Sequence, residues 1–585
     1  MFPMRKQGMG QSLVLSIPVC LAELFVMFLW LGASAFAAQA AAPSLQSPNP
    51  LLPDPPIKQV GERLFKETRF AEFFASHMRQ DNVNLPATAR DPRMDVVKVQ
   101  RVPGGQVPNP YRGQSMNCRT CHFVEELSQT VSPVGSRSYA DFSPRSHVPA
   151  RADGQRTTVR NSSNLVESLV APPELRFLHR DGEFTSAATL VISTLTGRNF
   201  GWLPGESSRA IAHIARVIRE DDGRAPLARR YGGASYAKLL SAAPEIPEYF
   251  RLSPEFRIDV AKATDKQIVH AIARIMAGYL ETLTFSQDRD GRYNGSPYDL
   301  FLAKNGLPAQ PAPGETALQY SQRLLQQLES LNSPNWVTPR DGFLKFFLNQ
   351  QFVFNRGELE GLKIFLRLSP QLRGAEKNQD LPVPSHTGNC ARCHTPPRFT
   401  DFKFHNTGAA QDEYDAVHGA GAFARMTIPS YGERKRNPNA FLPATSHHPN
   451  ASGILRSIPD LSDPRKVDLG MWNVYANRDF PEPQRLLRAL MCPSGSSCNP
   501  KRILPLTIAR FKTPTLRDLG QSDPYLHSGQ MQTIEDVLVF YQRVSALARA
   551  GKLRNDDPEM AGVSIDDLDA FYLASFLRSL NEDYD

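Results

Sequence analysis

Apolar residues recur at helical spacing in several segments of this chain. The pattern is clearest at 207–223, SSRAIAHIARVIREDDG, where we expect Ser207 or Ser208 to cap a helix and Gly223 to end it. The same spacing predicts four more helices, at 265–283, 318–331, 533–544 and 564–580. The alternation that marks half-buried strands is rare. The chain is therefore predicted to be mainly α.

Long loops rich in proline and glycine separate these helices. The 585 residues include 48 prolines and 37 glycines. A proline-rich stretch at 44–58, SLQSPNPLLPDPPIK, is predicted to be extended. We expect five parts along the chain. They are a signal peptide (1–40), a Pro-rich linker (41–58), an N-terminal domain (59–285), a connecting insertion (286–345) and a C-terminal domain (346–585).

The N-terminus has the form of a secretory signal, with a basic start, an apolar run and small-residue sites ending at Ala37 or Ala40. Glu23 interrupts the apolar run, which favours cleavage over the alternative, a retained anchor. Cys20 lies in a poor lipobox and is expected to leave with the signal. No later apolar run reaches membrane-spanning length, so no stable span is expected after signal removal.

Four of the seven cysteines lie in two C-x-x-C-H units about 270 residues apart. Two thiols at this spacing add to the vinyl groups of one porphyrin, and the following histidine becomes the proximal iron ligand. A thioredoxin-like motif needs a βαβ context, and a zinc site needs further Cys or His pairs; neither is visible. Two covalent haem c groups are therefore predicted, held by Cys118, Cys121 and His122, and by Cys390, Cys393 and His394.

Covalent haem attachment in bacteria occurs outside the cytoplasm, which agrees with export to the periplasm. In that oxidising compartment Cys492 and Cys498 are expected to form a disulfide across a short polar loop. The net charge of +8 comes from scattered Lys and Arg, which argues against nucleic acid. An acidic redox partner or acidic protein substrate suits this surface; a merely solvated surface is the alternative.

The second haem motif continues as CHTPPRFTDFKFHNTG, and FKTPTLRDLGQSDPYLHSGQMQTIEDVLVFYQR follows at 511–543. These segments resemble the bacterial dihaem cytochrome c peroxidase and MauG superfamily, in its longer branch. In the first half, RNSSNLVESL and HRDGEFTSAATLV resemble the segment that builds the open face of the first haem. The resemblance implies two cytochrome c-like haem domains, with peroxide chemistry at the first haem and electron transfer at a six-coordinate second haem.

The resemblance also implies the sixth ligand of the second haem. In the family this ligand, Met in the peroxidases and Tyr in MauG, falls seventeen residues after the proline of a T-A-P-Y turn. Here the turn is SDPY, with Pro524, and the interval leads to Tyr541. A phenolate favours Fe(III) and higher states, whereas a thioether favours Fe(II). The alternative is that Tyr541 is a core residue and that Met531 or another residue is the sixth ligand.

The sequence indicates less about the residues on the distal side of the first haem. The peroxidases carry a histidine eight residues before the asparagine that matches Asn161, and here that position is Asp153. This favours an open site, although His147 further upstream is a candidate for the distal side. Glu206 is the nearest match to the catalytic acid–base of the family. Its alternative is a charge at a helix N-terminus.

Where the family has a tryptophan between the haems, in F-W-D-G, this chain has His179 and Arg180 in HRDG, and Trp202 is a possible substitute. Further sites are implied by the resemblance. Asn161, Ser522 and Pro524 match the positions that hold calcium between the domains. Arg517 is a candidate partner for a haem propionate, with a surface ion pair as the alternative. His405 is expected to be a hydrogen-bonded structural histidine.

These residues predict an exported dihaem oxidoreductase that uses hydrogen peroxide. Electrons would come from a small redox protein, a cytochrome c or cupredoxin, or from an oxidised protein substrate. A dihaem oxygenase is the rival within enzymes, because rubber-cleaving dihaem proteins belong to the same superfamily. A plain electron carrier with two six-coordinate irons is the rival from another class.

Overall fold

The computed structural model describes residues 54–92, 101–102, 105–106, 116–125, 138–140, 145–341, 352–370, 383–492, 498–519 and 522–582. The predicted signal peptide and most of the predicted linker lie outside these residues. Contacts group Leu45–Asp585 into one unit, whose elements are described below.

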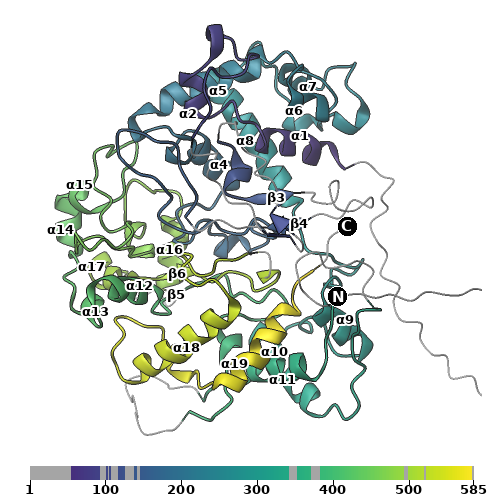
Figure 1. The fold of residues 1–585 in the computed structure, drawn as a ribbon, viewed down its shortest axis with the longest axis vertical. Coiled ribbons are helices and arrows are strands. Elements are labelled where there is room, and N and C mark those ends of the chain that lie inside the picture. Colours follow the sequence, from purple (N-terminus) through teal and green to yellow (C-terminus); the bar gives the residue numbers. More distant parts are fainter. Residues whose placement is uncertain are drawn as a thin grey trace, which may run out of the picture. The chain divides into compact units, whose positions relative to one another are not determined.

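Helices of the N-terminal part enclose a first hydrophobic core (Figure 1). They are α1 (Pro56–Phe65), α2 (Glu72–Ser76), α4 (Ala187–Leu195), α5 (Ser207–Glu220), α6 (Pro226–Arg230), α7 (Tyr236–Ser241) and α8 (Asp265–Glu281). Helix α8 lies at the centre and contacts α1, α4 and α5. Gly61 of α1 permits a close approach, because a Cβ there would collide with the side chain of Tyr279.

Several helix boundaries differ from the sequence predictions, and those of α1 and α5 have a clear physical reason. Helix α1 starts at Pro56, inside the segment predicted to be extended, because proline is favoured in the first turn of a helix. Ser207 is the first residue of α5 and does not cap it; Glu206 is the N-cap and ends a short 3₁₀ turn, Pro204–Glu206. Helix α5 ends at Glu220, before Gly223, which adopts a positive φ of 75°.

The connecting segment and the C-terminal part share a second core. Its helices are α9 (Pro297–Lys304), α10 (Ala317–Glu329), α11 (Arg356–Leu366), α18 (Ile534–Arg549) and α19 (Asp567–Arg578). Helix α19 packs against α11 and α18. Gly361 lets α11 approach the backbone of α19, because a Cβ at Gly361 would collide with the carbonyl of Tyr572.

A third core lies among short helices between 409 and 503. They are α12 (Ala409–His418), α13 (Ala422–Arg425), α14 (Tyr431–Arg436), α15 (Pro438–Phe441), α16 (Gln484–Met491) and α17 (Pro500–Ile503). Phe177 joins this core from the N-terminal part and stacks edge-on against Phe404.

The strands in the described part of the chain are two or three residues long. They pair antiparallel as β1 (Arg101–Val102) with β2 (Gly105–Gln106), β3 (Phe123–Glu125) with β4 (Ser138–Ala140), and β5 (Phe404–His405) with β6 (Phe511–Lys512). The prediction of a mainly α fold is confirmed. Among the described helices, none is both long and apolar enough to cross a bilayer.

Candidate haem sites

Both C-x-x-C-H motifs adopt the same local geometry. Each begins with a 3₁₀ turn, Cys118–Thr120 in the first and Cys390–Arg392 in the second. The amide of His122 donates to the carbonyl of Cys118 at 2.9 Å, and that of His394 to Cys390 at 2.8 Å. Each histidine thus lies one turn beyond the first cysteine, so both thiols and the imidazole belong to one compact loop.

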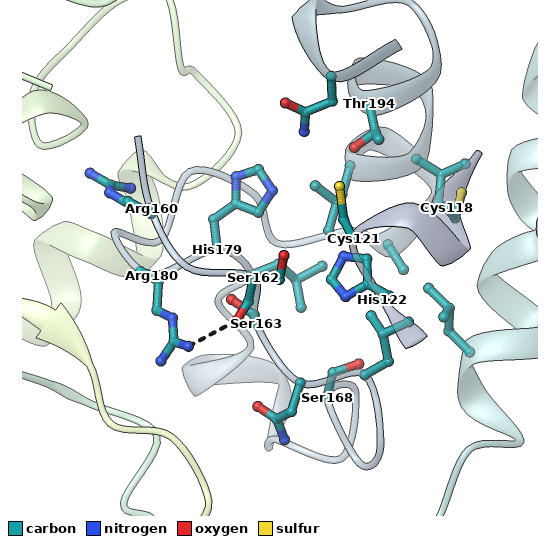
Figure 2. A pocket seen from close by; sticks show the side chains of 18 of the residues that line it. Cys118, Cys121, His122, Arg160, Ser162, Ser163, Ser168, His179, Arg180 and Thr194 are labelled. Atoms are coloured by element: carbon teal, nitrogen blue, oxygen red, sulfur yellow. Dashed lines mark hydrogen bonds between the residues drawn. The ribbon is translucent and has the colours of Figure 1, made fainter. Parts of the chain in front are cut away.

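A cavity of about 410 Å³ adjoins the first motif and is lined by Cys118, Cys121 and His122 (Figure 2). Its volume lies within the range of about 300–1,000 Å³ typical of cofactor sites. Burial raises the pKa of Cys121 to about 11, so the thiol is not a reactive thiolate. Cys118 and Cys121 form no disulfide. Two adjacent half-buried cysteines and a histidine beside a cavity fit a covalently attached haem.

The cavity wall also carries a histidine–carboxylate pair. His179 Nδ1 lies 3.1 Å from Glu183 Oε2, and Arg456 Nη1 lies 3.2 Å from the same oxygen. His179 has a positive φ of 62°, a conformation that is uncommon for a residue with a Cβ and that is often found at functional sites. The side chain of His179 is 38% exposed. Glu183 therefore orients the imidazole of His179, and Figure 2 shows His179 and His122 around one pocket.

The predicted catalytic residues Glu206 and His147 are not among the described residues that line this cavity. Glu206 accepts from Arg151 Nη2 at 2.8 Å and from the amide of Leu203 at 2.8 Å. Although its partial burial acts in the opposite direction, the bond from Arg151 lowers the pKa of Glu206. Glu206 lies at the N-cap of α5, which is the position of the alternative interpretation as a charge at a helix N-terminus. His147 pairs with Thr157 in an isolated β-bridge.

Arg517, the predicted partner for a haem propionate, is buried in an ion pair. The residue is 2% exposed, and its guanidinium donates to both carboxylate oxygens of Asp299, at 3.0 and 2.9 Å. Cations that do line the cavity include Arg180 and Lys512. Lys512 Nζ donates to the carbonyl of Phe177 at 2.6 Å, and burial and then Arg180 lower the pKa of Lys512 to about 8. An anionic group in the cavity would stabilise both cations.

The second motif has a fixed histidine. His394 Nδ1 lies 3.0 Å from the carbonyl of Phe399, which leaves Nε2 as the nitrogen available to iron. Burial lowers the pKa of His394, which favours the neutral imidazole that binds metal. Burial and then the nearby sulfurs of Cys393 and Cys390 raise the pKa of the Tyr541 phenol. Met531, the alternative ligand, packs against the same small apolar cluster as Tyr541.

His405 is bonded on both ring nitrogens, as expected for a structural histidine. Its Nδ1 lies 2.6 Å from Asp557, and its Nε2 lies 2.9 Å from Asp401. Although burial lowers the pKa of His405, the two carboxylates raise it well above its usual value. His405 thus ties β5 to the loop that follows the second motif.

The predicted calcium residues from the two halves of the chain meet. The side chain of Asn161 bonds to the carbonyl of Pro524 and lies 3.3 Å from the carbonyl of Leu526. Its Oδ1 is buried and has no hydrogen-bond partner among the described residues. The atom that donates to the carbonyls of Pro524 and Leu526 is the amide nitrogen of Asn161, not its oxygen. Ser522 instead donates its hydroxyl to the carbonyl of Asp518 at 3.1 Å.

Two further predicted positions are structural. Cys492 and Cys498 form a disulfide with Cα atoms 6.0 Å apart. Trp202 is fully buried in the N-terminal core, where its Nε1 donates to the carbonyl of Phe70 at 3.2 Å. Trp202 does not line the described cavity.

No family model matches the chain. One curated protein, cytochrome-c peroxidase IdrP2 of Denitromonas iodatirespirans, is 24% identical over 156 residues, which are 27% of this chain and 28% of that protein. The match thus spans little more than a quarter of this relative.

Solved structures of dihaem proteins are also similar to the chain. The dihaem peroxidase BthA of Burkholderia thailandensis E264 is 17% identical with a TM-score of 0.39, covering 91% of this chain and 87% of BthA. A MauG-like protein associated with microbial copper homeostasis is 14% identical with a TM-score of 0.38, covering 91% and 95%. The resemblance predicted from the motifs, to the dihaem cytochrome c peroxidase and MauG superfamily, is confirmed by the curated match, which is named a cytochrome-c peroxidase.

Proposed function

We propose that this protein is an exported dihaem c-type oxidoreductase that acts on hydrogen peroxide at its first haem. The observation that carries the proposal is the cavity bounded by Cys118, Cys121 and His122 on one side and the His179–Glu183 pair on another. An electron carrier whose two irons are both six-coordinate would not need a titratable pair of side chains in an open cavity. The relative IdrP2 is named a cytochrome-c peroxidase, and this name supports the same assignment.

The first haem would be held by the thioether bonds of Cys118 and Cys121 with His122 on iron, and it would supply the iron that binds and reduces peroxide. His179 would move one proton from the oxygen nearer the iron to the outer oxygen, so that water leaves. Glu183 would hold the imidazole in the required tautomer, and Arg456 would keep Glu183 ionised. Lys512 and Arg180 would bind the propionates.

The second haem would be attached to Cys390 and Cys393 with His394 on iron, and it would store or relay oxidising equivalents. Tyr541 is proposed as its sixth ligand, in keeping with the interval from Pro524 and the position of Tyr541 beside the motif. A phenolate is a hard anionic ligand, so it lowers the reduction potential of this haem.

Electrons would return from a small redox protein, a cytochrome c or cupredoxin, or from a protein substrate. The net charge of +8 suits an acidic partner. The proposed location is the periplasm. Calcium would be held by Asn161 and the carbonyl of Pro524, which elemental analysis of the purified protein would detect.

Addition of peroxide to the diferric protein tests the function. We expect the absorption bands of the first haem to change at once, because a cavity with an acid–base group is open to peroxide. We also expect no need for prior reduction. An unchanged absorption and EPR spectrum after peroxide would identify a plain electron carrier, whereas product formation from an apolar polymer with oxygen alone would identify an oxygenase.

Replacing Tyr541 by Phe tests the sixth ligand. We expect the six-coordinate ferric EPR signal of the second haem to become five-coordinate or water-bound, because the oxygen ligand is lost. Met531→Leu serves as the matched control from the same apolar cluster and should leave the signal unchanged. A Tyr541→Phe spectrum identical to wild type would make Tyr541 a core residue only.

A further inference from the structure

Tyr293 and Glu167 form a buried hydrogen-bonded pair at the wall of the cavity. The hydroxyl of Tyr293 donates to Glu167 Oε2 at 2.6 Å, and Gln287 Nε2 donates to Glu167 Oε1 at 3.1 Å. Tyr293 is 6% exposed and Glu167 is 7% exposed, yet Glu167 lines the same cavity as His122. Glu167 also has a positive φ of 54°, a conformation retained when its surroundings require it.

The other side of Tyr293 faces the loop after the second haem motif. Arg398 Nε donates to the hydroxyl of Tyr293 at 3.2 Å. The next residue, Phe399, accepts the bond from His394 Nδ1 through its carbonyl. Tyr293 therefore links the wall of the first cavity to the loop that orients the proximal histidine of the second motif.

The charges around Tyr293 determine which form of an oxidised ring is stable. Arg517 lies over the ring with its guanidinium carbon 3.9 Å from the centroid, and Arg398 lies at the hydroxyl. Asp299 and Glu582 pair with Arg517 and offset part of its charge. Two neighbouring cations disfavour a ring that keeps its proton and gains a positive charge. A ring that loses its proton to Glu167 stays neutral.

We propose that Tyr293 is a redox relay between the two haems and that Glu167 is its proton acceptor, an inference that rests on the proposed function. One electron passes from Tyr293 to an oxidising equivalent that peroxide leaves on the first haem, and the phenolic proton moves to the Glu167 carboxylate. The O–H bond breaks and a neutral tyrosyl radical remains. An electron from the second haem then reduces the radical, and the proton returns from Glu167. Burial, which raises the pKa of Glu167, makes the carboxylate a better acceptor.

The alternative is that this pair only ties residues 286–295 to both halves of the chain. That role predicts a loss of thermal stability in variants but no change in radical chemistry. A spectroscopic readout therefore separates the two roles, because a merely structural tyrosine gives no radical.

The experiment uses the dihaem protein mixed with peroxide and frozen within milliseconds for EPR. We expect a tyrosyl radical signal in wild type that narrows when ring-deuterated tyrosine is incorporated. In Tyr293→Phe the signal should be absent, and oxidation of the second haem should slow by about tenfold or more. Tyr320→Phe is the matched control, because Tyr320 is buried in α10 and its hydroxyl donates to the carbonyl of Pro308 at 2.8 Å, a group that does not take up a proton as a carboxylate does.

Glu167→Gln keeps the shape of the side chain and removes the proton acceptor, so it should lose the radical and slow the second haem in the same way even if Tyr293→Phe folds poorly. A radical of unchanged size in both variants, or an unchanged rate at the second haem, would overturn the relay. If the first haem of wild type does not react with peroxide at all, the proposed function fails and the relay fails with it. A first haem that reacts normally while both variants match wild type overturns the relay alone.

Discussion

Replacing Cys118 by Ala is expected to remove stable covalent attachment of the first haem and leave the second haem in place. Cys390→Ala is expected to do the reverse. The physical reason is that each thioether bond is formed within one short loop, and the two loops belong to different cores. Denatured wild-type protein should retain two haems per chain, and each variant should retain one, measured by intact mass and by haem absorption.

Cys492→Ala provides the control for this experiment. It removes a cysteine that is paired with Cys498 and lies outside both motifs, so both haems should remain. Wild-type protein with a single covalent haem would exclude the two-haem architecture. Loss of both haems from Cys118→Ala alone would mean that the two sites do not mature independently.

Replacing His179 by Gln should slow the reaction of the ferric first haem with peroxide by roughly 10²–10⁴-fold, the usual effect of losing a general acid–base group. Glutamine preserves a polar side chain in the cavity but does not exchange protons near neutral pH. Stopped-flow absorption at several peroxide concentrations separates binding from the later step. Binding should change little, because the iron remains open.

Glu206→Gln is the matched control for His179→Gln. Glu206 bonds to Arg151 and to the amide of Leu203, so its loss should lower the melting temperature and leave the peroxide kinetics intact. The reverse result, slow kinetics in Glu206→Gln and wild-type kinetics in His179→Gln, would return the acid–base role to Glu206. Glu183→Gln should show an intermediate effect, because it leaves the imidazole in place without its orienting carboxylate.

Features of this protein that depend on neighbours in the chain were predictable from the sequence alone. The C-x-x-C-H units form their loops through bonds that span four residues, so the pattern itself predicts the chemistry. The helices were predictable for the same reason, because a helical apolar face is a local periodic pattern. Helix α8 and the predicted segment 265–283 begin at the same residue. The ends of helices were less predictable. Ser207, for example, was expected to cap α5 but is its first residue.

The surroundings of each haem site depend on contacts between residues far apart in the chain. Glu206 meets Arg151 across 55 positions, Arg517 meets Asp299 across 218, and Tyr293 meets Glu167 across 126. A carboxylate binds any guanidinium that the fold brings near it, and 59 acidic and 67 basic residues offer many such pairings. The sequence therefore determined which residues are proposed to attach haem, whereas the tertiary structure decided which side chains surround them, because burial and charge pairing are set by packing.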